Sequence, residues 1–107
     1  MLRRTARADH PEVREIVPSD HCVLRFRQRF PVRTPGGAEV LEALLDHLEA
    51  ADVSGWPPAW AARDRPAELW AVHEDLAFPL ARTPQRGRWL AVTCLRRGSG
   101  GPSSGSG

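Results

Sequence analysis

Apolar and polar positions follow a helical period in residues 19–30, which read SDHCVLRFRQRF. When each residue advances by about 100°, one side of the segment gathers the apolar set Cys22, Val23, Phe26 and Phe30. The other side gathers the polar set His21, Arg25, Gln28 and Arg29. The pattern predicts an amphipathic helix that has Ser19 or Asp20 as its N-cap and that ends at Pro31.

A second amphipathic helix is predicted over residues 38–51, after the turn sequence RTPGG at 33–37. Its apolar positions recur at helical spacing and are Leu41, Leu44, Leu45 and Leu48. Its opposite face is acidic and holds Glu39, Glu42, Asp46 and Glu49. We expect the leucines to pack into a core and the carboxylates to face water.

The C-terminal half has the short apolar runs that are typical of β-strands. Three antiparallel strands are predicted at 68–73, 76–82 and 88–97, joined by short turns. Pro79 should place the middle strand at an edge or at a bulge, because proline has no N–H to donate. A short first strand at 12–17 is an alternative to an irregular head.

The segment between the second helix and these strands, residues 52–68, contains three prolines and a glycine. These residues argue against regular structure in its first half. We expect Trp56 and Trp60 to fold back over the edge of the core rather than to form a ligand platform.

The predicted fold class is α+β, with two helices packed on one face of a small antiparallel three- to four-stranded sheet. We expect a flexible or extended N-terminal arm at 1–17 and a single domain at 18–97. Residues 98–107, GSGGPSSGSG, have no apolar side chain and should form a disordered Gly/Ser-rich tail, whether native or appended. About 80 residues then remain to bury a core, enough for one small domain.

Composition restricts the function classes without naming one. All 15 basic side chains are arginine, a bias that a GC-rich coding sequence explains, so arginine content alone does not indicate nucleic-acid binding. The net charge is only +2, but basic residues cluster in 2–7, 25–33 and 82–97. No stretch is long and apolar enough to span a bilayer, so we expect no membrane partner and a cytoplasmic protein.

The cysteines and histidines do not indicate a metal site or a cofactor. Cys22 and Cys94 are expected to be small buried hydrophobic residues rather than nucleophiles. His10, His21, His47 and His73 are scattered, and no pair has the spacing of a zinc knuckle. We therefore expect no cofactor.

The candidate chemistry is metal-independent cleavage of RNA, in which the 2′-OH attacks the adjacent phosphate. Histidine can transfer the protons near neutral pH, and arginine grips phosphate through its planar fork. His21, Arg25 and Arg29 are one helical turn apart and can converge on one phosphate. The other candidate catalytic residues are His73 and Arg96, and the candidate RNA-binding residues are Arg27, Thr93 and Arg97. The alternative is that this histidine and these arginines form an ordinary solvated face.

The segment HCVLRFRQR, in which arginines follow a histidine at four and eight residues, resembles the start of small bacterial proteins of the RelE/BrnT-type toxin superfamily. The order of helices followed by a strand meander with arginine near the end is also similar. The resemblance spans residues 19–97 in architecture, and its motif consists of His21, Arg25 and Arg29. It implies a compact α+β ribonuclease, often neutralised by an antitoxin partner.

Two hypotheses follow, and the sequence leaves open whether the protein is an enzyme. The first is a toxin-like, metal-independent ribonuclease (an mRNA interferase) whose partners are RNA and an antitoxin or other protein. The second is a non-enzymatic module that binds nucleic acid or protein in a bacterial defence or regulatory complex. In either case we expect a monomer or a small oligomer.

Overall fold

The computed structural model describes residues 5–29, 38–61 and 67–97. The tail predicted at 98–107 and the helix end predicted at Pro31 lie outside these residues. The elements in chain order are β1 (Ala6–His10), β2 (Val13–Pro18), α1 (Asp20–Arg29), α2 (Ala38–Ala50), β3 (Asp52–Ser54), the 3₁₀ helix η1 (Ala59–Ala61), β4 (Leu69–His73), β5 (Leu76–Arg82), β6 (Arg88–Ala91) and β7 (Leu95–Arg96).

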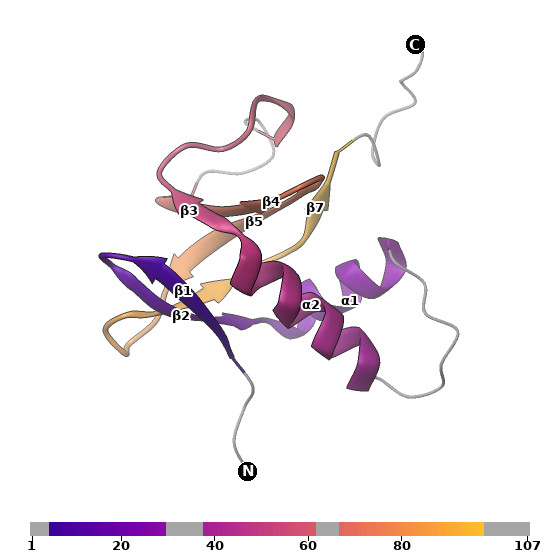
Figure 1. The fold of residues 1–107 in the computed structure, drawn as a ribbon, viewed down its shortest axis with the longest axis horizontal. Coiled ribbons are helices and arrows are strands. Elements are labelled where there is room, and N and C mark those ends of the chain that lie inside the picture. The colour runs from indigo at the N-terminus through magenta and orange to yellow at the C-terminus, as the bar shows by residue number, and fades with distance from the viewer. Residues whose placement is uncertain (1–4, 30–37, 62–66, 98–107) are drawn as a thin grey trace.

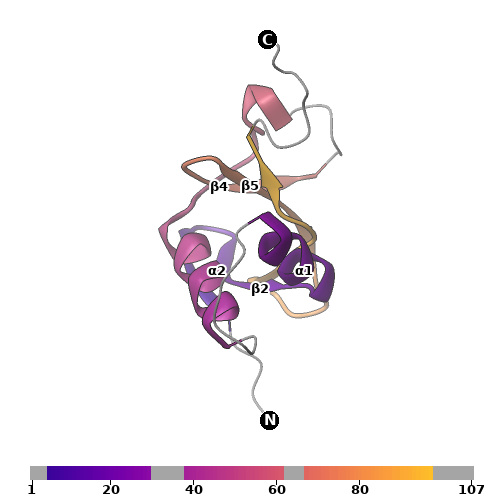
Figure 2. The ribbon, with the colours of Figure 1, turned by 90° about the vertical axis from the view of Figure 1, so that its right-hand side faces the viewer.

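The strands form one mixed sheet in the order β1-β2-β6-β5-β4-β3, and β7 pairs with β5 beyond the end of β6. All neighbours are antiparallel except β2 and β6, which run parallel. The sheet curls until its edge strands β1 and β3 contact each other, so that it nearly closes into a barrel (Figure 1). Figure 2 shows α1 and α2 side by side, with β2 on one side of them and β4 and β5 on the other.

The predicted three- to four-stranded antiparallel sheet is therefore wrong, although two helices are present. The difference arises at the N-terminus, where β1 and β2 form a hairpin. Strand β2 then pairs with β6, so that Ile16 lies opposite Trp89. This pairing joins segments that are distant in the sequence, and no local pattern of apolar residues predicts it. The strand considered at 12–17 lies at Val13–Pro18 as part of this hairpin.

The core forms where the helices face the concave side of the sheet. Helix α2 buries Val40, Leu44, Leu45 and Leu48, and α1 buries Cys22 and Phe26. The sheet contributes Ile16, Phe78 and Trp89 among other residues. The described residues of both predicted apolar helix faces thus point inward, apart from Leu41 and Val23, which are half-buried, whereas Phe30 lies outside the described residues. In the described part of the chain, neither helix has the length and apolar character needed to cross a membrane.

The strand predicted at 88–97 is interrupted, and Pro79 explains why. Between the pairs Leu80–Ala91 and Ala77–Leu95, three residues of one strand face two residues of β5. The Pro79 carbonyl accepts a 3.0 Å hydrogen bond from the Val92 N–H, but proline cannot return one. The ladder is therefore disrupted at this bulge, and pairing resumes in β7.

The two tryptophans after α2 have different environments. Trp60 packs against a small buried cluster formed by Ala61, Trp70 and Ala77, as expected for a residue that covers the core edge. Trp56 is 81% exposed, so its predicted covering role is wrong. Prolines 57 and 58 follow Trp56 directly, and their fixed backbone favours an extended chain that leads away from the core.

Candidate functional site

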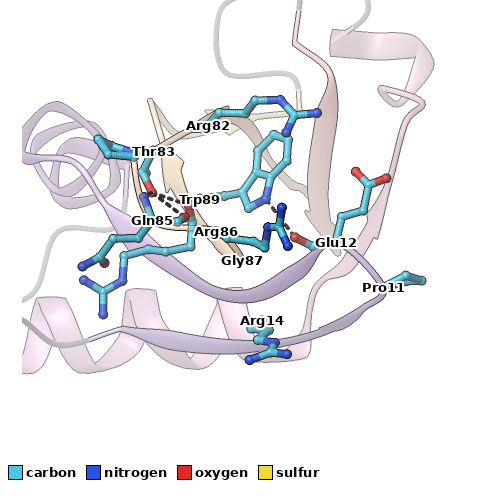
Figure 3. Close-up of a pocket in the computed structure, with 11 residues that line it drawn as sticks. Pro11, Glu12, Arg14, Arg82, Thr83, Gln85, Arg86, Gly87 and Trp89 are labelled. Carbon is cyan, nitrogen blue, oxygen red and sulfur yellow. Dashed lines mark hydrogen bonds between the residues drawn. The ribbon is translucent and has the colours of Figure 1, made fainter.

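An open cavity of about 550 Å³ lies at one end of the sheet, where two hairpin loops meet. One wall comes from the β1–β2 turn and the start of β2, and the other comes from the β5–β6 loop and its flanking strands (Figure 3). The lining residues are Pro11, Glu12, Arg14, Arg82, Thr83, Pro84, Gln85, Arg86, Gly87, Arg88 and Trp89. Four of these eleven are arginines and only one is acidic, so the cavity favours an anion.

Trp89 joins the two walls of this cavity. Its indole N–H donates a 3.0 Å hydrogen bond to the Glu12 carbonyl, and the side chain is 3% exposed (Figure 3). The Arg82 guanidinium lies 4.9 Å from the centre of the Trp89 ring, within range of a cation–π interaction. Trp89 therefore positions the β1–β2 turn and Arg82, and its buried ring is not available for stacking on a base.

Two of the arginines are held by carboxylates. Arg82 donates from Nε to Glu68 over 2.7 Å, and this hydrogen bond together with the Glu68 charge raises the pKa of Arg82. Arg88 donates from Nε to Glu15 over 2.8 Å, across the parallel β2–β6 pair. These partners fix the two guanidiniums and offset part of their charge.

The other two arginines, Arg14 and Arg86, have no carboxylate partner among the described residues. An arginine guanidinium carries five N–H donors, and no carboxylate among the described residues occupies those of Arg14 and Arg86. An anion that enters the cavity would therefore gain most from these two side chains.

The loop that carries Arg86 is rigidly built. Gly87 has a φ of 84°, a conformation that glycine adopts without strain, and its carbonyl accepts hydrogen bonds from the N–H groups of Arg14 (2.7 Å) and Glu15 (3.1 Å). The Thr83 hydroxyl donates to the Arg88 carbonyl over 2.6 Å. A Cβ on Gly87 would come within 3.3 Å of Cγ and Cδ of Arg14, so glycine also lets Arg14 lie flat against the loop.

The lining of this cavity is suited to holding an anion, and Glu12 is the one carboxylate in it. None of the described residues that line it is a histidine, and arginine does not release its proton near neutral pH. Planar guanidiniums that can donate two parallel hydrogen bonds are suited to phosphate or carboxylate oxygens.

A cluster of titratable groups lies at the other end of β5. His47 of α2 and His73 of β4 contact each other through Nδ1 atoms 2.9 Å apart, and the Glu74 carboxylate lies 4.0 Å from Nε2 of His73. The pKa of His47 is lowered, first because burial disfavours the charged ring and then because His73 lies beside it. The His47 ring also meets the Phe26 ring edge-on, with centroids 5.7 Å apart.

The predicted residues of α1 do not reach the cavity. His21, Arg25 and Arg27 are exposed on α1, and none of them lines it. Arg29 is the last residue of α1, and its side chain lies outside the described part of the structure. The structure thus shows a polar stripe on α1 that does not contribute to the arginine-lined cavity.

Two predicted residues of the C-terminal half lie in one row of the sheet, with Leu76 between them. His73 pairs with Leu76, and Leu76 pairs with Arg96, so the three side chains share one row and one face of the sheet. Two strand spacings, about 10 Å, separate the outer two residues. Thr93 is 3% exposed and so has little surface for a ligand, whereas Arg97 is exposed.

Both cysteines are buried, as expected from the sequence. Cys22 and Cys94 are fully buried and are not joined by a disulfide. Burial raises the pKa of the Cys22 thiol, and the neighbouring Cys94 raises it further. A thiol of this kind stays protonated and is a poor nucleophile, which is consistent with a packing role.

None of the residues that line the cavity is a candidate from the sequence, and neither is His47 or Glu74. Arg14 and Arg86 lie in short charged segments that are typical of solvated loops, and only the meeting of the two hairpins brings them together. His47 is assigned to neither face of α2 by the sequence pattern. The available signals are the basic cluster at 82–97, which contains Arg86, and the position of His73 at a strand end.

Comparison with known proteins gives no relative for this arrangement: no family model, no curated protein and no solved structure matches the chain.

Proposed function

We propose that the protein binds the phosphate groups of a nucleic acid in the arginine-lined cavity, with RNA as the ligand. The observation that supports this proposal most is the presence of four arginines, two of them without a carboxylate partner among the described residues, around a cavity of about 550 Å³. The likeness of the His21–Arg25–Arg29 segment to RNA-cleaving toxins favours RNA over other phosphates. An RNA ligand also fits the cytoplasm as the compartment.

The strength of such binding should depend mainly on Arg14 and Arg86. A hydrogen bond to a charged group contributes about 1.5–3 kcal/mol, and a bidentate arginine can make two to one phosphate. Arg82 and Arg88 already share their charge with Glu68 and Glu15, so an added phosphate competes with these carboxylates. Replacing the first pair should therefore cost more affinity than replacing the second.

We expect the double variant R14Q/R86Q to bind a short labelled single-stranded RNA about tenfold or more weakly than the unchanged protein. Fluorescence anisotropy at several salt concentrations measures this. Because each phosphate contact on a single strand contributes about −0.7 to the slope of log K against log salt, loss of two contacts should reduce the slope by about 1.4.

The matched control is R25Q/R27Q, which removes the same charge from exposed positions on α1 that do not line the cavity. This control should stay within about twofold of the unchanged protein if the cavity is the binding site. Equal losses in both double variants would mean that RNA responds only to the total charge, and the cavity proposal would be abandoned. A larger loss of affinity in the control would instead place the RNA-binding surface on α1.

Metal-independent cleavage of RNA is a second proposal, supported by the exposed stripe of His21 and Arg25 one turn apart on α1. Incubation of RNA with the protein in the presence of a chelator should then give products ending in a 2′,3′-cyclic phosphate. The variant H21A should slow this cleavage by about 100-fold or more, because it removes a general acid or base, while the melting temperature stays unchanged. No products from the unchanged protein would remove the enzyme proposal and leave binding intact.

A further inference from the structure

Three side chains that can bind metals converge at the end of β5 opposite to the arginine-lined cavity. His47 comes from α2, His73 from the last position of β4, and Glu74 from the turn that follows it. One donor atom from each lies within 4.8 Å of the others. Strand β5 has seven residues, so about 20 Å separates this cluster from the cavity, and the two sites are distinct.

The spacing of the two imidazoles fits one coordination geometry better than another. Two nitrogens bound to one ion at about 2.0–2.1 Å are about 2.9 Å apart when the angle between them is 90°, and about 3.3 Å apart in a tetrahedron. The Nδ1 atoms of His47 and His73 are 2.9 Å apart. The same distance is that of a hydrogen bond between the two rings, so an ion bound here would replace the proton between them and hold the nitrogens as neighbouring ligands of a square-planar or octahedral site.

We propose that His47, His73 and Glu74 bind one divalent transition-metal ion, with the two imidazole nitrogens at right angles and the carboxylate as third ligand. Two imidazoles and a carboxylate suit ions such as Ni²⁺, Cu²⁺ and Fe²⁺, which accept these angles. The remaining coordination positions are open to water, because the Glu74 side chain is 71% exposed and that of His73 is 26% exposed.

The surroundings favour this site over a pair of histidines that meet by chance. The His47 ring packs edge-on against Phe26, and the strand pairing of His73 with Leu76 fixes the backbone from which the second ring projects. Both ligand positions are therefore set by packed elements before an ion arrives, which lowers the ordering cost of binding.

The experiment uses the full chain, freed of metal by a chelator and titrated with Ni²⁺ in a calorimeter. We expect one ion per chain, and binding weakened by at least about tenfold in H47Q and in H73Q. The chain contains four histidines, so H10Q and H21Q are matched controls that remove a histidine outside the cluster. Both controls should bind Ni²⁺ as the unchanged protein does.

A second measurement locates the ion and guards against misfolded variants. Cu²⁺, which is paramagnetic in either geometry, should broaden the NMR signals of the His47 and His73 rings and spare those of His10 and His21. If H47Q does not fold, H73Q and E74Q decide the question, since both positions are partly or largely exposed. The proposal is overturned if Ni²⁺ does not bind, if the cluster variants bind it unchanged, or if a control variant loses it.

This inference does not rest on RNA binding. If the protein binds Ni²⁺ but not RNA, the metal site stands and the proposed function is wrong. If it binds RNA but not Ni²⁺, the proposed function stands and the metal site is wrong.

Discussion

At the scale of single residues, Glu74 stands in a backbone conformation that usually belongs to glycine. Its φ is 55°, and with Asp75 it forms the two-residue turn between the paired residues His73 and Leu76. A positive φ at only the first of two turn positions is typical of a type II′ turn, which prefers glycine there. The turn holds a carboxylate beside two histidines at the cost of backbone strain.

The variant E74G should therefore be more stable than the unchanged protein while binding Ni²⁺ more weakly. Relief of the left-handed conformation should stabilise the folded state by about 1–2 kcal/mol. The greater freedom of glycine in the unfolded chain should offset about 0.5–1 kcal/mol of this gain. The net gain corresponds to a rise of a few degrees in melting temperature for a domain of this size. Thermal unfolding without metal measures the first effect, and Ni²⁺ titration measures the second.

The comparison variant is E74Q, which keeps the strained backbone and removes the charge. It should weaken Ni²⁺ binding without raising the melting temperature. A melting temperature of E74G below that of the unchanged protein would show that the turn is not strained at this position.

At this scale the sequence predicted one residue of the histidine cluster, His73, and none of the residues that line the cavity. His73 was a candidate because it stands at a strand end, yet its partner depends on how α2 packs against β4. Arg14 and Arg86 are 72 positions apart and meet only because β2 pairs with β6. Side-chain neighbours of this kind are set by tertiary contacts, which local patterns do not encode.

At the scale of elements, the start of α1 is tied to the far end of the chain through Ser19. The Ser19 hydroxyl accepts a hydrogen bond from the Cys22 N–H (2.9 Å), as an N-cap does, and donates one to the Val92 carbonyl (2.8 Å). The sequence left Ser19 and Asp20 as alternative caps, and the structure selects Ser19. The same residue thus caps α1 and satisfies a carbonyl at the bulge that follows β6.

The variant S19A should lose about 1–2 kcal/mol of stability, because it removes the cap and leaves the part-buried Val92 carbonyl without this donor. Urea unfolding followed by circular dichroism measures the change. S54A is the matched control: its hydroxyl is exposed and bonds only to nearby Trp56 backbone groups, so its loss should cost less than about 0.5 kcal/mol. Equal effects of the two variants would argue against the bridging role of Ser19.

Elements with a strong local period were predicted well, and those without one were not. Helix α2 follows its leucine period, and the β4–β5 hairpin follows its apolar runs. The β1 strand, ARADH, has only alanines between its polar residues, so its inward face carries almost no hydrophobic signal. Buried and exposed positions alternate, with Ala6 fully buried and Arg7 exposed, but alanine side chains are too small to give a clear hydrophobic pattern.

At the scale of the whole molecule, the near-closure of the sheet makes the N-terminal hairpin part of the core. Strand β2 is held on one side by β1 and on the other by β6, and it also contacts α1. A chain of this length buries a limited core, so each such strand should contribute substantially to stability. A freely moving segment at 6–18 would contribute nothing to the free energy of unfolding. Substitutions in β2 therefore distinguish a packed hairpin from a freely moving segment.

Ile16 gives the sharpest test, because it is fully buried between β1 and β6. Truncation of such a side chain to alanine removes transfer free energy and leaves a cavity, so I16A should lower the free energy of unfolding by about 2–5 kcal/mol, and I16V by about 0.5–1.5. The milder variant keeps the measurement possible if I16A does not fold. The control is R7A, at an exposed position of β1, and it should change the free energy of unfolding by less than about 0.5 kcal/mol. Urea midpoints at constant slope measure all three. If both isoleucine variants match R7A, the hairpin is not part of the cooperative core, and the cavity between its turn and the β5–β6 loop has no fixed wall.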